Sequence, residues 1–415
     1  MGTVMDLRKE GFHMKKIFAL LLSMAMILAV LPLTSLAQEK YIIGVAFQNV
    51  TSDTEIQKDY YTNELAPALG MEFIFSEAIK DTETLVTFIE NCYAKGAVGI
   101  INYYTAGRGR GAEAADQYEM FFITQASKLD DATLDLEYNL GNCGASVDGM
   151  ARAYTAAMES VLADGENHSV LMCTTAAVGQ VAASHYYSTQ AMLETMQNKY
   201  NLTYSKSIDE IINTDSPGEV DTGNPNIKIF LVPGTDNDKT LATISTPLQS
   251  GDYDIFVAVS GYANYTSAIA EVERAKNMDI KVVATASIEK QTLTGFTTLD
   301  PLGNPILNAV ILNPLNVANA FCAAAIYNAL NGGAEALKDA DGNAAQLFVN
   351  PWPCPDAETY ANIAKLDTEH DTYVINADDL QRLMVTSNPD ANHDSYAEYL
   401  MELADIDAII ARKIK

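Results

Sequence analysis

Basic side chains are scarce in this chain. Its 415 residues include 26 Lys and Arg against 54 Asp and Glu, which gives a formal net charge of -28 at pH 7. A surface of that sign repels the phosphates of nucleic acids and of anionic lipids, so both are excluded as expected partners. The hydrophobic fraction of 48% is large enough for sizeable cores, and the chain is therefore not a disordered acidic segment.

Cysteines are few as well. There are five, Cys92, Cys143, Cys173, Cys322 and Cys354, an odd number without a Cys-x-x-Cys pair. This spacing is not typical of a disulfide framework, and Cys173, in a strand pattern, and Cys322, in an alanine-rich helix pattern, are expected to be small core residues. No cysteine precedes Cys92, and an N-terminal lipid-modified cysteine therefore has no candidate.

The sequence also lacks the common catalytic motifs. We find no GxSxG, HExxH or GxxxxGK[ST] pattern. Four of the five histidines lie beyond the N-terminal segment, and they are scattered without metal-ligand spacing: His168, His185, His370 and His393. The segment "DADGN" begins like a calcium loop, but Asn350 stands where the acidic twelfth ligand belongs, so an Asp-Gly turn is favoured. We expect no enzyme activity, no metal and no cofactor.

The N-terminal segment has the pattern of a secretory signal. Lys15 and Lys16 precede the apolar run "IFALLLSMAMILAVLPL", and small residues before Ala37 offer a cleavage site. Pro32 interrupts the run, which makes a retained membrane anchor the weaker alternative. The pattern predicts a signal peptide over residues 1–37 and a soluble protein exported to the periplasm or another extracytoplasmic space.

Short apolar runs alternate with amphipathic segments along the rest of the chain. Continuous apolar strands joined by helices indicate parallel sheets covered on both faces, so we predict an α/β, doubly wound fold. The predicted strands are 41–47, 71–75, 98–102, 120–124, 170–173, 227–232, 255–259, 280–284 and 309–312. The capping-box pattern "SDTE" from Ser52 predicts a helix directly after the first strand.

Polar and aromatic residues follow the carboxyl ends of these strands, where open α/β sheets bind ligands. The candidates for ligand contact are Phe47, Gln48, Asn49, Asn102, Tyr103, Tyr104, Gln125, Thr174, Thr175, Ser260, Tyr262, Thr285, Ser287 and Asn313. For the two adjacent tyrosines, packing between helices is an equally good interpretation.

A glycine-rich run with two arginines, "AGRGRGAEAADQ", leads from one strand end into a predicted helix. Backbone N–H groups at a helix N-terminus attract anions, so Arg108 and Arg110 are candidates for contact with a carboxylate or phosphate. The alternative, a solvated turn, is favoured. The spacing does not fit a dinucleotide fingerprint.

The order of segments from about Lys40 to Gly333 resembles that of the type 1 periplasmic binding proteins, which deliver solutes to ABC importers. "YIIGVAF" is similar to the first strand of that family, and "KGAVGIIN" to a later strand of the same lobe. "DYDIFVAVSGYANYTSAIAEVERAKNMDIKVVATAS" resembles its late strand-helix-strand unit, and "LNAVILNPLNVANAFCAAAIYNALNGG" the return to the first lobe.

The resemblance implies two doubly wound lobes that close over a small molecule by a hinge. The expected first lobe is 38–127 plus 306–346, and the expected second lobe is 128–305. An ABC transporter permease is the expected partner of a monomeric receptor. A ligand-sensing module for a membrane signalling receptor is the alternative, because it would use the same hinge.

Departures from the family pattern bear on the ligand. The carboxylate and arginine that hold sugars in the family are not found in "VVATAS" and "SHYYSTQAM", where His185 and Tyr186 lie nearest to the expected arginine. The remaining aromatic, amide and hydroxyl groups suit a planar solute. The sequence therefore favours a nucleoside or base, as in the basic-membrane-protein nucleoside binders, with a sugar as the alternative.

The chain continues past this region as an extension, 347–415. "PWPCP" is typical of an extended crossing, "TYVI" of a short strand, and "SYAEYLMELADIDAIIARK" of a helix. An apolar stripe from Tyr396 to Ile410 predicts a packed face. We expect that face to cover the second lobe, with a partner surface as the alternative.

Overall fold

The computed structural model describes residues 40–126, 129–174, 183–234 and 237–414. The predicted signal peptide and the candidate Thr175 lie outside the described residues. All five cysteines are buried and free, and the sequence predicted this burial for Cys173 and Cys322.

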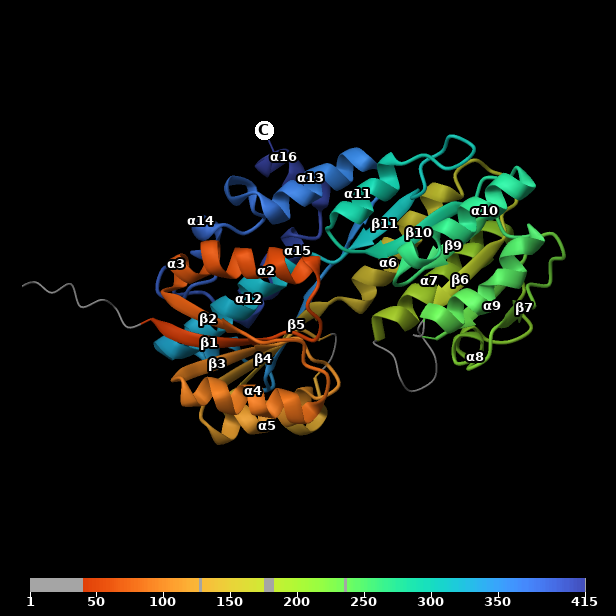
Figure 1. Ribbon diagram of the computed structural model, residues 1–415. Coiled ribbons are helices and arrows are strands. Elements are labelled where there is room, and N and C mark those ends of the chain that lie inside the picture. Colours follow the sequence, from red (N-terminus) through yellow and green to blue (C-terminus); the bar gives the residue numbers. More distant parts are fainter. Residues whose placement is uncertain (1–39, 127–128, 175–182, 235–236, 415) are drawn as a thin grey trace, which may run out of the picture. The chain divides into compact units, whose positions relative to one another are not determined.

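The first sheet is parallel throughout, in the order β2-β1-β3-β4-β5-β12 (Figure 1). Its strands are β1 Tyr41–Ala46, β2 Met71–Phe75, β3 Ala97–Asn102, β4 Phe121–Thr124, β5 Asn139–Ala145 and β12 Ala345–Val349. Helices α4 (Thr82–Ala94) and α5 (Arg108–Gln117) cover one face of this sheet, and α2 (Ser52–Tyr60) and α12 (Leu315–Asn328) the other. This is the doubly wound arrangement that the apolar strands predict.

The second sheet repeats the same winding, in the order β7-β8-β6-β9-β10-β11-β13. Its strands are β6 Val170–Thr174, β7 Gly218–Val220, β8 Ile229–Pro233, β9 Ile255–Ala258, β10 Lys281–Ala286, β11 Ala309–Leu312 and β13 Trp352–Cys354. The two edge strands, β7 and β13, are antiparallel and the others parallel. Strands β6, β9 and β11 are buried at every position and β10 in its middle, which explains their continuous apolar sequences.

The helices lie between the strands and after them. In the first half of the chain they are α2 Ser52–Tyr60, α3 Ala66–Leu69, α4 Thr82–Ala94, α5 Arg108–Gln117, α6 Val147–Val161, α7 Ala183–Tyr200 and α8 Ile208–Ile212. In the second half they are α9 Asn237–Ser250, α10 Thr266–Lys276, α11 Lys290–Thr297, α12 Leu315–Asn328, α13 Ala357–Thr368, α14 Ala377–Leu380, α15 His393–Glu402 and α16 Ile406–Lys413.

The chain passes from one sheet to the other at positions that differ from the predicted boundaries 128 and 306. Strand β5 belongs to the first sheet, and the crossing to the second follows it before α6. Strand β11 belongs to the second sheet, and the return comes after it, before α12. A third crossing joins β12 to β13. Hydrogen bonding to β4 and β10 decides these memberships, and such pairing between distant strands leaves no local sequence pattern.

The apolar face of α15 packs on α12 and β12 of the first sheet rather than on the second lobe, contrary to our expectation. Tyr396 of α15 packs edge-on against Phe321 of α12, with ring centroids 5.2 Å apart. Asn328 of α12 donates a hydrogen bond to the Tyr396 hydroxyl at 2.9 Å. The predicted strand "TYVI" is a turn, and its Ile375 carbonyl accepts a hydrogen bond from Tyr60 of α2 at 2.6 Å.

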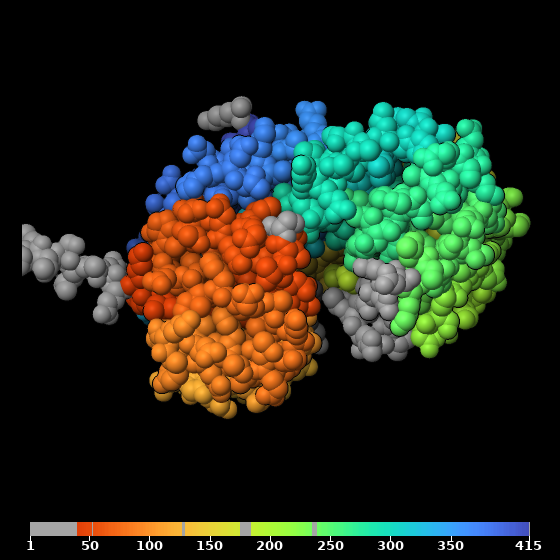
Figure 2. Space-filling model, in the orientation of Figure 1, coloured from red at the N-terminus to blue at the C-terminus, as the bar shows by residue number. Residues whose placement is uncertain are grey.

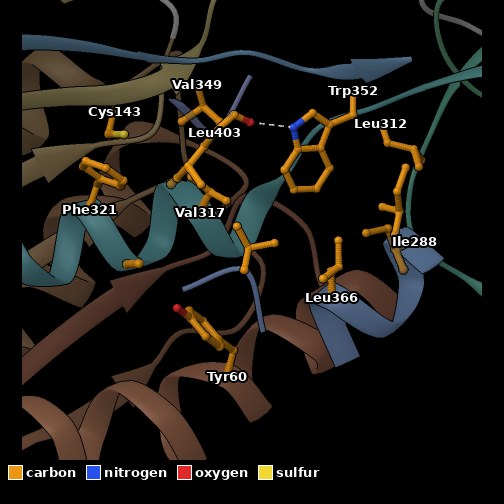
Figure 3. Close-up of a cluster of buried hydrophobic side chains, with 14 of the residues drawn as sticks. Tyr60, Cys143, Ile288, Leu312, Val317, Phe321, Val349, Trp352, Leu366 and Leu403 are labelled. Carbon is orange, nitrogen blue, oxygen red and sulfur yellow. Dashed lines mark hydrogen bonds between the residues drawn. The ribbon is translucent and has the colours of Figure 1, made fainter. Parts of the chain in front are cut away.

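Trp352 ties the extension to both sheets. Figure 3 shows its indole beside residues of α12 and α13, with Nε1 donating to the Leu403 carbonyl at 2.9 Å. It lies on β13, the strand formed by "PWPCP", in register with Leu312 of β11. Figure 2 shows the blue C-terminal residues adjoining both the red and the blue-green surfaces, and α13 packs against α2 and α11. The extension is therefore an integral part of the core.

Strand β5 depends on a glycine where it meets β12. Gly141 has φ +107°, and a Cβ atom there would lie 1.9 Å from the Ala345 carbonyl oxygen. We expect Gly141→Ala to lower the free energy of unfolding by about 2 kcal/mol or more, because the backbone is strained and the strands must separate. Gly218→Ala is the matched control: nothing lies within 4 Å of its Cβ position, so the change should stay within about 0.5 kcal/mol.

Urea unfolding of both glycine variants measures this difference. Equal midpoints for the two variants would contradict the close approach of β5 to β12.

Candidate ligand-binding site

A pocket of about 490 Å³ lies beyond the carboxyl ends of β9, β10 and β11. Helices α2 and α13 complete its wall. The lining residues are Asp53, Ile56, Gln57, His185, Val259, Ser260, Gly261, Tyr262, Ala263, Asn264, Thr285, Ala286, Ser287, Ile288, Glu289, Gln291, Asn313, Leu315 and Asp367. The volume suits a small molecule, and the position agrees with the general location of ligands in open α/β sheets.

Helix α2 brings Asp53 into the pocket from its first turn. The capping residue is Thr51, one position before the predicted Ser52, and its backbone N–H donates to Thr54 Oγ1 at 3.0 Å. Because Thr51 has extended backbone angles, the helix begins at Ser52, one residue before the start that the predicted capping box implies.

Helix α13 holds the opposite wall through Tyr360. The Tyr360 hydroxyl accepts a hydrogen bond from the Glu289 backbone N–H and donates to the Glu289 carbonyl, both at 2.8 Å. These bonds fix the loop between β10 and α11, which contributes Ser287 and Glu289 to the lining. The extension thus supports the pocket as well as the core.

Burial changes the titration of the carboxyl groups in this pocket. Asp367, 5% exposed, has a pKa raised to about 7, first by burial and then by the negative charge of Asp53. The pKa of Asp53 is raised by burial, and the charge of Glu289 adds to this. Asp53 Oδ1, Asp367 Oδ1 and Asn313 Oδ1 are buried and without a hydrogen-bond partner. Such atoms are costly unless a ligand satisfies them.

Six of the predicted contact residues line the pocket. They are His185, Ser260, Tyr262, Thr285, Ser287 and Asn313. All but His185 lie at or just after the ends of β9, β10 or β11, and Thr285, the penultimate residue of β10, also bonds to the Tyr154 hydroxyl at 2.7 Å. Burial lowers the pKa of His185, so its ring favours the neutral form. The sequence located these residues through their places at strand ends.

The other predicted residues lie elsewhere. Tyr103 packs against Phe47, with ring centroids 4.9 Å apart, and bonds to the hydroxyl of Tyr61 at 3.0 Å and to Asn319. Gln125 donates to Asn319 at 2.6 Å, and Asn102 donates to Thr124 Oγ1 at 3.1 Å. Thr174 bonds to Thr189 at 2.6 Å, and Tyr186 donates to Asp209 at 2.7 Å. Tyr104 is half-buried, and Gln48 and Asn49 are exposed. Tyr103 thus fits the packing interpretation.

The two arginines of the glycine-rich run already have carboxylate partners. Arg108 pairs with Asp130 at 2.8 Å, and Arg110 pairs with Glu113 three residues along α5. Arg108 also donates to the Thr105 carbonyl at 2.9 Å. These ion pairs favour the structural interpretation over an anion site.

The sequence analysis missed the carboxylates and amides that come from helices. Asp53 and Gln57 lie one helical turn apart on α2, and Asp367 lies near the end of α13. The capping pattern around Ser52 located the start of α2. The spacing of Asp53 and Gln57, four residues apart, could therefore have been used to place both side chains on one face of this helix. No local pattern connects Asp367 with a strand end, because α13 belongs to the extension.

Two sheets with the same strand order, three crossings and a pocket at the strand ends define the fold of the type 1 periplasmic binding proteins. The chain is similar in structure to a periplasmic solute-binding protein of an ABC transporter from Actinobacillus succinogenes with bound D-allose (TM-score 0.54, 14% identity, covering 78% of this chain and 100% of that one). It is also similar to an arabinose-binding protein from Geobacillus stearothermophilus (TM-score 0.54, 15% identity, covering 78% of this chain and 98% of that one).

A third similar structure is an ABC transporter solute-binding protein from Bacillus halodurans with bound myo-inositol (TM-score 0.54, 14% identity, covering 78% of this chain and 97% of that one). No protein-family model matches the chain, and no curated protein matches it. Within the described residues, no helix has both the length and the apolar character needed to cross a membrane.

Proposed function

We propose that this chain is an extracytoplasmic solute-binding receptor that delivers a small hydroxyl-rich molecule to an ABC importer. The observation that carries the proposal is the pocket at the carboxyl ends of β9–β11, with unpaired buried oxygens on Asp53, Asn313 and Asp367. Hydroxyl groups donate hydrogen bonds, so a polyhydroxylated ligand satisfies such acceptors. The bound D-allose and myo-inositol of two structural neighbours have this chemistry.

A sugar-like ligand is favoured over the nucleoside suggested by the sequence. Tyr262 is the one aromatic side chain among the described lining residues, and Tyr103 and Tyr104 are not among them. A base needs flat apolar faces for stacking, whereas carboxylate, amide and hydroxyl groups dominate this lining. Secretion, the permease partner and the monomeric state belong to the same proposal.

Thermal unfolding of the purified chain against neutral sugars, cyclitols and nucleosides tests the function. A ligand present at 100 times its dissociation constant adds about 2.7 kcal/mol to the stability and shifts the midpoint by a few degrees. We expect a shift with a sugar or cyclitol. A shift with nucleosides alone would support a receptor but contradict the sugar-like ligand.

The site itself is tested with Asn313→Ala. Removing an amide that bonds to the ligand should weaken binding by about 1 to 3 kcal/mol with little loss of stability. Asn226→Ala is the control, since Asn226 is exposed and does not line the pocket. Equal affinity of the two variants, measured by calorimetry, would place the ligand elsewhere.

A further inference from the structure

The charged side chains among the described lining residues of the pocket are acidic. Asp53, Glu289 and Asp367 line it, and none of the described lining residues is a lysine or arginine. Among the lining residues that the structure describes, His185 is the one basic group, and it favours its neutral form because burial lowers its pKa. Such a lining repels anionic ligands and attracts cations, as does the net charge of -28 over the whole chain.

Asp367 is the most buried of these carboxylates. Its side chain is 5% exposed, and its Oδ1 atom has no hydrogen-bond partner. Its backbone carbonyl accepts a bond from Asn316 Nδ2 at 3.0 Å, which fixes this residue at the end of α13. Cations are stabilised near helix C-termini, where the carbonyl groups point outward.

Asp53 faces the same pocket from α2, and its Oδ1 atom is likewise buried and unpaired. Two carboxylates from two helices thus line one pocket, and the charge of one acts on the other, without a lysine or arginine among the described lining residues. A neutral ligand would donate hydrogen bonds to them and leave their charge uncompensated, which is costly in a buried site. An ammonium group supplies three donors and the missing charge together.

We propose that the pocket takes a hydroxylated amine, such as an amino sugar or an aminocyclitol, whose ammonium group pairs with Asp53 and Asp367. This inference rests on the proposed receptor function and specifies its ligand class. Ser260, Thr285 and Asn313 are then left to bind the hydroxyl groups.

Binding of such an amine depends on pH. The titratable groups around Asp367 are Asp53 and Tyr60 of α2 and Tyr373 of the following turn. Burial raises the pKa of both tyrosines, so they stay neutral. Because the pKa of Asp367 is raised to about 7, the amine must displace its proton at lower pH. Affinity should therefore fall between pH 7 and pH 5, by up to about tenfold per unit.

Calorimetry with matched ligand sets tests the inference. Each set holds a sugar, its free amine and its N-acetyl form: glucose, glucosamine and N-acetylglucosamine, and the galactose counterparts. We expect at least one free amine to bind at least about tenfold more tightly than both of its uncharged relatives. Asp367→Asn should remove this preference and its pH dependence, whereas Asp371→Asn, an exposed neighbour outside the lining, should keep both.

The outcomes separate the two proposals. Binding of the neutral sugars with equal or greater affinity would overturn the amine and leave the receptor function standing. If none of the sugars, free amines or N-acetyl forms binds, the result would count against both the amine ligand and the receptor function. If Asp367→Asn does not fold, as judged by circular dichroism, Asp53→Asn takes its place, and an unchanged amine preference in the folded variant would overturn the inference.

Discussion

Replacing Trp352 with alanine should lower the free energy of unfolding by about 3 to 5 kcal/mol, the usual range for deleting a buried large aromatic side chain. Trp352 is fully buried, and its indole donates to the Leu403 carbonyl. The variant loses packing between β13, α12 and α13 and leaves that carbonyl without its donor (Figure 3). Because this cluster joins the extension to both sheets, the whole chain should unfold at lower denaturant.

Denaturant unfolding followed by circular dichroism measures the effect. Trp352→Phe keeps an aromatic ring and should cost much less. Met401→Ala, at a side chain 63% exposed, should be nearly neutral. A neutral Trp352→Ala would show that the extension is not needed for the core.

Asp367→Asn should remove a steep pH dependence of stability. In the folded chain the pKa of Asp367 is raised to about 7, whereas an unfolded Asp titrates near about 3.9. Between these values the folded state binds a proton that the unfolded state does not. This contribution to stability is therefore fully present below pH 4 and is lost as pH rises toward 7, by about 1.4 kcal/mol per unit.

The difference between wild type and Asp367→Asn isolates this group from the other acidic residues. Asparagine cannot ionise, so we expect the variant to gain stability relative to wild type as pH rises from 4 to 7. Thermal or urea unfolding at several pH values, without ligand, provides the data. A constant difference across this range would contradict the raised pKa of Asp367.

Much of the fold could be predicted because its signals are local. All nine strands predicted between residues 41 and 312 are present with small shifts of their ends, since buried parallel strands have continuous apolar sequences, whereas the strand predicted at "TYVI" is absent. Strand β5, "NLGNCGA", was missed because glycine and asparagine have low strand propensity, and pairing with β4 and β12 stabilises it instead. The edge strands β7, β12 and β13 were also not predicted as strands.

The candidate site likewise contains residues that could be predicted from the sequence and residues that could not. Ser260, Thr285 and Asn313 were found because the ends of parallel strands meet at one edge of a sheet. Asp53 and Asp367 were missed because helix residues carry no such positional rule, and Glu289 was missed although it lies in the loop that follows β10. Without them the lining looked neutral, and the sequence favoured a nucleoside.

The sequence by itself determined the α/β class, the doubly wound pattern and the acidic charge, because hydrophobic periodicity and composition are properties of neighbouring residues. Only the tertiary structure decided which sheet β5 and β11 join, where the extension packs, and that Asp53 and Asp367 face one pocket. These features depend on contacts between residues up to several hundred positions apart, and burial shifts the carboxyl pKa values only after such contacts form.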